Sequence, residues 1–167
     1  KWSEVPGRAE LDVSRCYVPG AVGWGGSMHG DYFARRWGFI VFLEAKVAKM
    51  LAGFLSRYDE KRDGFWTASR TGRVEGSIAI DGLRANTDGA HLRWFIVSED
   101  LHGRCVGSAL LSNAVDFCRS SGYRKVYLWT FEGLLSARRL YEKAGFRLVE
   151  QRPGTQWGKE VHEQRFE

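Results

Sequence analysis

The spacing of hydrophobic positions divides the chain into helices and strands of ordinary length. Residues 42–58 place large apolar side chains three or four positions apart, which predicts an amphipathic helix. Residues 104–120 and 136–144 show the same spacing, and both stretches are followed by a glycine that can end a helix, at Gly122 and Gly145. Three helices are therefore expected from periodicity alone.

Short runs of β-branched and aromatic residues predict the strands. Residues 65–69 and 74–80 are joined at Thr71 and Gly72, which is the pattern of a hairpin. A polar loop follows at residues 82–89. Four further strands are expected at residues 91–97, 125–130, 146–151 and 159–166.

The first forty residues have a weaker pattern. Residues 1–19 predict an extended arm or linker, which leaves a single domain over residues 20–167. The glycine-rich residues 21–30 are interpreted as a short, irregular strand, and Asp31 is expected to cap a short helix that ends at Gly38. The glycine spacing resembles that of a P-loop, but no Lys-Ser/Thr pair follows, so a nucleotide-phosphate loop is excluded.

The order of these elements predicts an α/β protein, with one mixed sheet and helices on its faces. The length of 167 residues suits one domain, and contents of 44% hydrophobic and 27% charged residues are ordinary for a folded soluble protein. No stretch approaches the roughly 18 apolar residues of a membrane span. A soluble domain with no membrane partner is therefore expected.

Charge and metal-binding residue types narrow the function further. The net charge of +5 comes from Lys and Arg that are spread in ones and twos, without a basic tail, helix-turn-helix or zinc-finger pattern. A modest positive excess also suits a polyphosphate cofactor. Three cysteines and four histidines have no ligand spacing, so we expect no metal, no disulfide framework and a cytoplasmic location.

The most informative segment for chemistry is a strand, loop and helix over residues 92–111. A buried strand ends at Val97, a polar loop follows, and residues 103–107 begin a helix with two glycines. Backbone amides at a helix start have no internal partner and the dipole end is positive, so this turn suits a pyrophosphate. Taken alone, the same turn is equally compatible with a purely structural role.

A second motif follows some thirty residues later, at residues 134–146, and reads LLSARRLYEKAGF. Together the two segments resemble the GNAT superfamily, whose cofactor loop usually reads Arg/Gln-x-x-Gly-x-Gly/Ala and whose next helix ends in Leu-Tyr-Glu-Lys-x-Gly-Phe. The resemblance covers residues 38–151. It implies a GNAT-like fold with a mostly antiparallel sheet, a splayed strand pair and helices on both faces. It also implies an N-acetyltransferase that moves an acetyl group from acetyl-CoA to a primary amine by direct attack, through a tetrahedral intermediate.

The resemblance implies the cofactor-binding residues as well. The backbone of Phe95, Ile96 and Val97 would pair with the pantetheine arm of CoA. The pyrophosphate would lie against His102, Gly103, Arg104, Cys105, Val106, Gly107 and Ser108. His102 stands where Arg or Gln is usual and Cys105 where Gly is usual, so weaker CoA binding is expected.

The resemblance assigns a general acid but leaves the base and the acceptor open. Tyr141 matches the tyrosine that often protonates the departing CoA thiolate, and a phenol with a pKa near 10 carries its proton at neutral pH. Glu75, His91 and Glu99 stand on or beside central strands and are the candidate bases. The acceptor pocket is expected between residues 27–58 and the edge strand at 159–166. Its candidate wall residues are His29, Tyr32, Trp37 and Trp157.

Residues 21–167 also look like the acetyltransferase domains that follow a MarR-like regulator in some bacterial fusion proteins. The likeness rests on Met-His-Gly-x-Tyr, Leu-Trp-Thr and Glu-Gln-Arg-Phe-Glu segments, and it implies a bacterial protein whose DNA-binding half lies outside this chain. Two alternatives remain: a non-catalytic acyl-CoA sensor, and a basic module that binds nucleic acid or a protein partner. A small-molecule or peptide amine is the expected partner, and a homodimer is left open.

Overall fold

The computed structural model describes residues 11–15, 17–38 and 41–167, which form seven strands, four α-helices and one 3-10 turn. In chain order these are β1 (Leu11–Ser14), α1 (Ala21–Trp37), α2 (Val41–Ser56), β2 (Gly64–Arg70), β3 (Arg73–Asp81), β4 (Ala90–Val97), η1 (Glu99–Leu101), α3 (Val106–Ser120), β5 (Val126–Phe131), α4 (Leu135–Lys143), β6 (Leu148–Gly154) and β7 (Val161–Phe166). The helices and strands predicted from residue 42 onward are confirmed, with ends shifted by a few residues.

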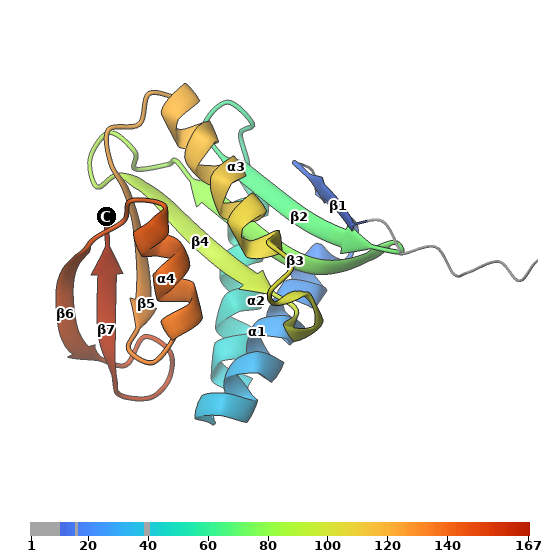
Figure 1. Cartoon of the computed structure of the whole chain (residues 1–167), viewed down its shortest axis with the longest axis vertical. Helices are drawn as coiled ribbons and strands as arrows, with labels where there is room; N and C mark the ends of the chain where they lie inside the picture. The colour runs from blue at the N-terminus through green and yellow to red at the C-terminus, as the bar shows by residue number, and fades with distance from the viewer. Residues whose placement is uncertain (1–10, 16, 39–40) are drawn as a thin grey trace, which may run out of the picture.

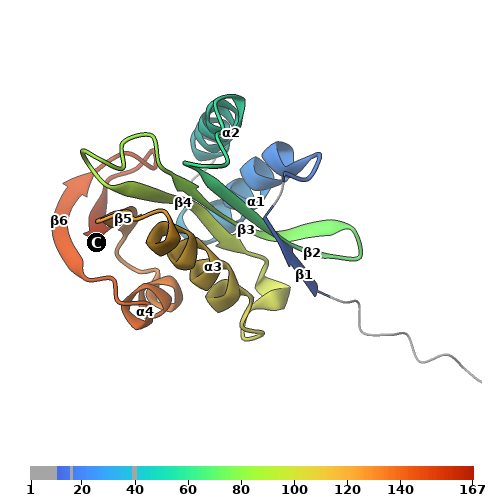
Figure 2. The same ribbon diagram turned by 90° about the horizontal axis from the view of Figure 1, so that it is seen from above.

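All seven strands form one sheet in the order β1-β2-β3-β4-β5-β7-β6. Neighbouring strands are antiparallel except β4 and β5, which run parallel. Helices α1 and α2 cover one face of the sheet, and α3 and α4 cover the other (Figure 1, Figure 2). The predicted α/β architecture, a mostly antiparallel mixed sheet with helices on both faces, is therefore confirmed.

The parallel pair β4 and β5 separates soon after it begins. Only two positions pair, Ala90 with Val126 and His91 with Tyr127. Beyond them the two strands diverge, and the gap opens beneath α4 (Figure 1). The predicted splay is confirmed, and it leaves the β5-facing edge of β4 unpaired after His91.

A β-bulge lies in β4 just where it leaves β5. The register on β3 passes from Ser77 opposite Ile96 to Ala79 opposite Arg93, so Trp94 and Phe95 together face one residue of β3. Trp94 takes a φ of +48°, which is rare for a bulky side chain. A bulge bends its strand and increases its twist, so this one helps to direct β4 away from β5.

Two apolar clusters stabilise the molecule, one on each face of the sheet. The cluster beneath α3 and α4 includes Ile78, Leu92, Leu110, Leu128 and Phe166. The cluster beneath α1 and α2 includes Leu51, Phe54, Phe65, Trp94 and Phe131. Side chains alternate across each strand, so the sheet supplies both clusters.

The interpretation of residues 21–30 as an irregular strand is wrong, because they form the first half of α1. Glycine is unfavourable inside a helix, but here it allows α1 to lie close to α2. A Cβ at Gly25 would meet Leu51 at 3.0 Å, and one at Gly30 would meet Glu44 at 3.0 Å. Asp31 lies within α1 rather than at its start and pairs with Arg35 at 3.0 Å.

The helix end predicted at Gly38 is confirmed, since Gly38 is the C-cap of α1 with a φ of +67°. Part of the predicted arm is also ordered as a strand: β1 pairs with β2, with Val13 opposite Ala68. Residues 1–10 and Cys16, which belong to the same predicted arm, lie outside the described residues. In the described part of the chain, no helix is both long and apolar enough to cross a membrane.

Candidate functional site

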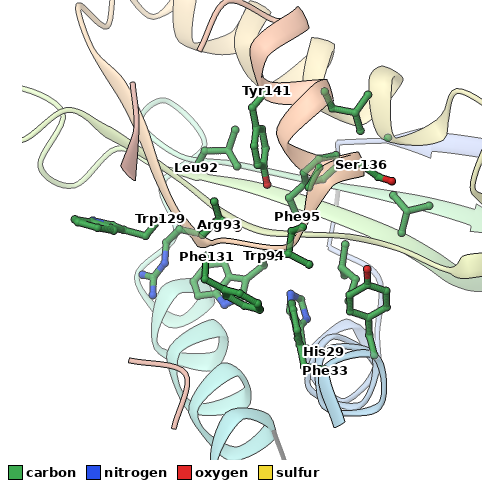
Figure 3. Close-up of a pocket in the computed structure, with 18 of the residues that line it drawn as sticks. His29, Phe33, Leu92, Arg93, Trp94, Phe95, Trp129, Phe131, Ser136 and Tyr141 are labelled. Atoms are coloured by element: carbon green, nitrogen blue, oxygen red, sulfur yellow. The ribbon is translucent and has the colours of Figure 1, made fainter. Parts of the chain in front are cut away.

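A cavity of about 620 Å³ occupies the gap between β4 and β5. The bulged half of β4, the start of α3 and the helix α4 line it on one face of the sheet, and α1 and α2 line it on the other. Figure 3 shows Tyr141 approaching from α4 and His29 from α1, with Phe95 and Trp94 between them. The splay therefore creates a passage through the sheet with a different set of groups at each side.

The half of this cavity beneath α3 and α4 brings together nearly all of the residues predicted to bind CoA. Those that line it are Phe95, Ile96, Val97, His102, Gly103, Cys105, Val106, Gly107 and Ser108. Arg104, which was predicted with them, does not line the cavity. The Arg104 side chain is exposed, so any effect on an anion would act from outside the cavity.

The start of α3 presents free backbone donors to this half. The first helical hydrogen bond runs from the Ala109 amide to the Cys105 carbonyl, at 3.0 Å. The amides of residues 106–108 consequently have no acceptor within the helix, and they carry the positive end of its dipole. Because Gly107 has no side chain, α3 can lie close to α4: a Cβ there would meet Leu140 at 3.1 Å.

The loop before α3 uses two left-handed residues. Gly103 has a φ of +77° and Cys105 a φ of +60°. The first is easy for glycine, whereas the second places a cysteine in a conformation that glycine adopts at little expense. The position where the family usually has glycine thus requires a left-handed backbone, which explains the usual residue and marks Cys105 as strained.

The side chain of His102 is held by the strand that precedes it. Its Nε2 lies 3.0 Å from the Val97 carbonyl oxygen. A carbonyl only accepts, so Nε2 carries the proton and donates this bond. One ring nitrogen is therefore used to tie the loop to the end of β4, and only Nδ1 is left for other contacts.

Tyr141 lies in α4 and is almost fully buried, with its ring near those of Phe95 (5.9 Å), Phe146 (6.1 Å) and Phe166 (5.9 Å). Its hydroxyl points into the cavity (Figure 3). Burial raises the pKa of this phenol above its usual value, because the charged form is poorly solvated. Tyr141 is thus a neutral hydroxyl donor at the α4 side of the gap.

His29 occupies the opposite side and is also buried. Its Nδ1 lies 2.7 Å from the Gly25 carbonyl oxygen, one helical turn earlier in α1, and so donates to it. Burial lowers the pKa of His29 to about 4, so the ring is neutral at physiological pH. Nε2 then carries a lone pair, and the ring points into the cavity (Figure 3).

Of the three predicted bases, one lines the cavity and two do not. Glu75 pairs with Arg70 at 3.5 Å and Glu99 with Arg36 at 2.9 Å, and neither lines the cavity. Only His91 lines it; its ring stacks on Tyr127 at 4.5 Å, and burial lowers its pKa to about 3.

His29 was predicted from the sequence as a wall of the acceptor pocket and not as a base. Its position one helical turn after Gly25 was the signal that could have indicated a base. That signal was missed because residues 21–30 were expected to be a strand. Tyr32 and Trp157 line the cavity as expected, whereas Trp37 packs against Phe131 at 5.2 Å and does not. Among the described residues, no group of three potential ligands is placed to hold a metal ion.

Comparison with known proteins adds an independent line of information. The profile of the Acetyltransferase (GNAT) family matches residues 31–146. An uncharacterized N-acetyltransferase of Methanocaldococcus jannaschii is 28% identical over 121 residues, which are 69% of this chain and 53% of that protein. An N-acetylaspartate synthetase of Danio rerio is 27% identical over 123 residues, 73% of this chain and 43% of that protein. The chain therefore spans about half the length of these relatives.

The fold is also found among solved structures. The structure of yncA from Salmonella typhimurium, determined with its cofactor acetyl-CoA, superposes with a TM-score of 0.72 at 15% identity. The likeness covers 93% of this chain and 91% of that one, which establishes a shared fold over nearly the whole domain.

Proposed function

The chain belongs to the acetyltransferase (GNAT) family, and we propose that it transfers an acetyl group from acetyl-CoA to a primary amine. The observation that supports this most directly is the placement of Tyr141 and His29 on opposite sides of one gap in the sheet (Figure 3). A hydroxyl that can give a proton faces an imidazole that can take one, which is what transfer between a thioester and an amine requires.

The residues present fit a CoA thioester. The unpaired edge of β4 after His91 offers main-chain donors and acceptors to an extended arm carrying amide groups. The amides of residues 106–108 and the positive end of α3 suit a pyrophosphate. Phe95 and Tyr141 line the same cavity as these two regions, so the thioester would reach the gap from the α3 side.

The reaction would proceed by direct attack, through a tetrahedral intermediate. The amine nitrogen forms a bond to the acetyl carbonyl carbon, the carbon–sulfur bond breaks, and the products are an N-acetylamine and free CoA thiol. A main-chain amide of β4 near Val97 would hold the carbonyl oxygen as negative charge develops on it. The proton lost by nitrogen and the proton gained by sulfur balance.

Each proton transfer has a candidate residue on its own side of the sheet. His29 Nε2 would accept the proton from the attacking nitrogen, whose acidity rises sharply as the new carbon–nitrogen bond forms. Tyr141 would donate its phenolic proton to the departing sulfur. A neutral imidazole and a neutral phenol are both in the required state at physiological pH, for the reasons of burial given above.

The relatives do not identify the acceptor of this chain, because the matches cover only about half of each relative's length. The first experiment is calorimetric titration of acetyl-CoA into the protein, followed by a panel of amines with release of free thiol as the readout. Saturable binding and amine-dependent thiol release support the proposal.

Two other outcomes would overturn it. Saturable binding without thiol release for any amine identifies a non-catalytic acyl-CoA sensor. No binding at millimolar acetyl-CoA, combined with DNA affinity that falls steeply with salt, identifies a basic nucleic-acid module.

A further inference from the structure

We call the part of the cavity beneath α1 and α2 the acceptor half, because the proposed reaction brings the amine there. It has an unusual charge pattern for a site that would receive an ammonium group. Lys46 and Arg93 both line it. Among the residues that the structure describes, no aspartate or glutamate lines any part of the cavity. The remaining walls on this side are mainly aromatic, including Tyr32, Trp129 and Trp157.

Arg93 is a partly buried guanidinium with few strong acceptors. Its Nη1 lies 3.6 Å from a carboxylate oxygen of Asp81, but Arg57 already binds both oxygens of Asp81, at 3.1 and 2.5 Å. Its Nη2 is 3.5 Å from the sulfur of Met50, a weak acceptor. Two guanidinium groups thus share one carboxylate, and Arg93 has donors left over beside the cavity.

Lys46, in α2, also shares its carboxylate partner with other groups. Its ammonium donates to the Gln156 carbonyl oxygen. The nearby Glu163 attracts it, but this buried carboxylate already accepts from the Gln156 amide at 3.0 Å and pairs with Arg152 at 3.5 Å. Desolvation consequently lowers the pKa of Lys46 and of Arg93 relative to their usual values.

We propose that Arg93 and Lys46 form an anion site for the acceptor, and that the acceptor is a small amino acid whose carboxylate they bind while its amine is acetylated. This rests on the proposed acetyltransferase function. Arg93 directly precedes the bulge residue Trp94 and both line the cavity, so the carboxylate would lie in the same cavity as the reacting groups. An amine that lacks an anion would add no counter-charge for two cations that share their nearest carboxylates with other arginines, which disfavours polyamines and other cationic acceptors.

The aromatic wall indicates what the rest of such a molecule would contact. Phe131 and Trp157 meet edge to face at 5.2 Å, and Trp129 lines the same side. These rings offer an apolar aromatic surface that suits an uncharged side chain. His91, which also lines this side, has a lowered pKa mainly because it is buried and secondarily because Arg93 and Arg165 lie near it, so it adds no further positive charge.

The test compares matched acceptors that differ only in the anion. One series is L-phenylalanine, L-phenylalaninamide and 2-phenylethylamine; the second is L-leucine, L-leucinamide and 3-methylbutylamine; spermidine is the cationic comparison. Thiol release is followed for each with saturating acetyl-CoA. Loss of a charge-assisted, two-pronged contact is expected to lower kcat/KM roughly 10- to 100-fold for the amide and the plain amine.

Two variants test the assignment of residues. Arg93→Gln and Lys46→Gln should each reduce the ratio of kcat/KM between amino acid and amine at least fivefold, mainly through KM for the amino acid. Arg84→Gln is the matched control, because Arg84 is an exposed guanidinium that pairs with Asp88 at 3.1 Å and does not line the cavity. Acetyl-CoA binding by calorimetry shows whether each variant is folded. If Arg93→Gln does not fold, the ratio measured for Lys46→Gln tests the anion site.

The outcomes separate this proposal from the one on which it rests. Equal turnover of amino acids and their amine analogues, or preference for spermidine, overturns the anion site while leaving the acetyltransferase intact. If no amine of either series and no spermidine causes thiol release, both the anion site and the acetyltransferase proposal are overturned. An unchanged ratio in Arg93→Gln and Lys46→Gln, with preference for amino acids retained, shows that another group reads the carboxylate.

Discussion

The Ser77 hydroxyl on β3 donates a 2.9 Å hydrogen bond to the carbonyl of Trp94, the residue of β4 that has a φ of +48°. Both residues are buried, so the bond is shielded from water. The hydroxyl satisfies a carbonyl that the bulge has turned out of the regular ladder. One serine thereby holds the distortion beside which β4 leaves β5 and the cavity opens.

Replacing Ser77 with alanine is therefore expected to affect both stability and cofactor binding. The Trp94 carbonyl would lose its partner in a buried place, which lowers the free energy of unfolding by about 2 kcal/mol. A relaxed bulge would also weaken acetyl-CoA binding. Urea unfolding and calorimetry measure the two effects. Ser56→Ala is the control, since the Ser56 hydroxyl bonds the Gly53 carbonyl at 2.8 Å on the surface. Equal behaviour of the two variants would show that Ser77 does not hold the bulge.

Tyr141→Phe is expected to lower kcat roughly 100-fold, because the phenyl ring cannot protonate the departing sulfur. The Kd for acetyl-CoA should change less than about twofold, because the lost interaction forms mainly as the sulfur departs in the transition state. Tyr123→Phe is the matched control: its hydroxyl donates to the Arg62 carbonyl at 2.6 Å outside the cavity, so stability falls and turnover does not. Unchanged turnover in Tyr141→Phe would remove Tyr141 from the mechanism.

His29→Gln tests the base. The glutamine retains an amide donor but lacks a lone pair basic enough to take a proton, so kcat should fall roughly 100-fold with acetyl-CoA affinity retained. His91→Gln serves as the comparison, because His91 lines the cavity but stacks on Tyr127. If His91→Gln reduces kcat and His29→Gln does not, the base is on β4 instead of α1.

Stability should fall as the pH is lowered from about 6.5 to about 4, because His29 has a pKa of about 4 in the folded protein and near 6.5 when unfolded. In this window the unfolded chain binds a proton that the folded protein does not, so acid favours unfolding by about 1.4 kcal/mol per pH unit. His91, with a pKa of about 3, contributes in the same direction. Urea unfolding at several pH values should give a slope that is smaller by this amount in His29→Gln; an equal slope contradicts the prediction.

Cys105→Gly is expected to relieve strain in the cofactor loop. A left-handed conformation costs a non-glycine residue about 1–2 kcal/mol, and the added freedom of glycine in the unfolded chain removes part of the gain, so the net increase in stability is about 0.5 kcal/mol. Removing the Cβ should also tighten acetyl-CoA binding. Thr71→Gly is the control, since Thr71 has a φ of +51° in the hairpin away from the cavity. Both variants should gain stability, and only Cys105→Gly should gain affinity.

The sequence determined the parts of this protein that depend on local pattern. Helical spacing predicts α2, α3 and α4, and the hairpin at Thr71 and Gly72 predicts β2 and β3, because side-chain periodicity and turn chemistry act over a few residues. The motifs predict a cofactor role for the loop before α3 and a catalytic role for Tyr141, since a helix start that binds phosphate needs small residues at fixed spacing, and both roles remain predictions. The predicted link to a MarR-like regulator remains a prediction.

Tertiary structure decided the rest, because these features depend on contacts between distant segments. Residues 21–30 form a helix because α2 lies against their glycines, and that helix places His29 opposite Tyr141. The charge left on Arg93 depends on Arg57, which comes from another element and occupies the shared Asp81. The spacing of neighbouring residues does not encode the position of a proposed base across a splayed sheet. It also does not encode the charge balance of the partly buried cluster around Asp81. Both arise only when the chain has folded.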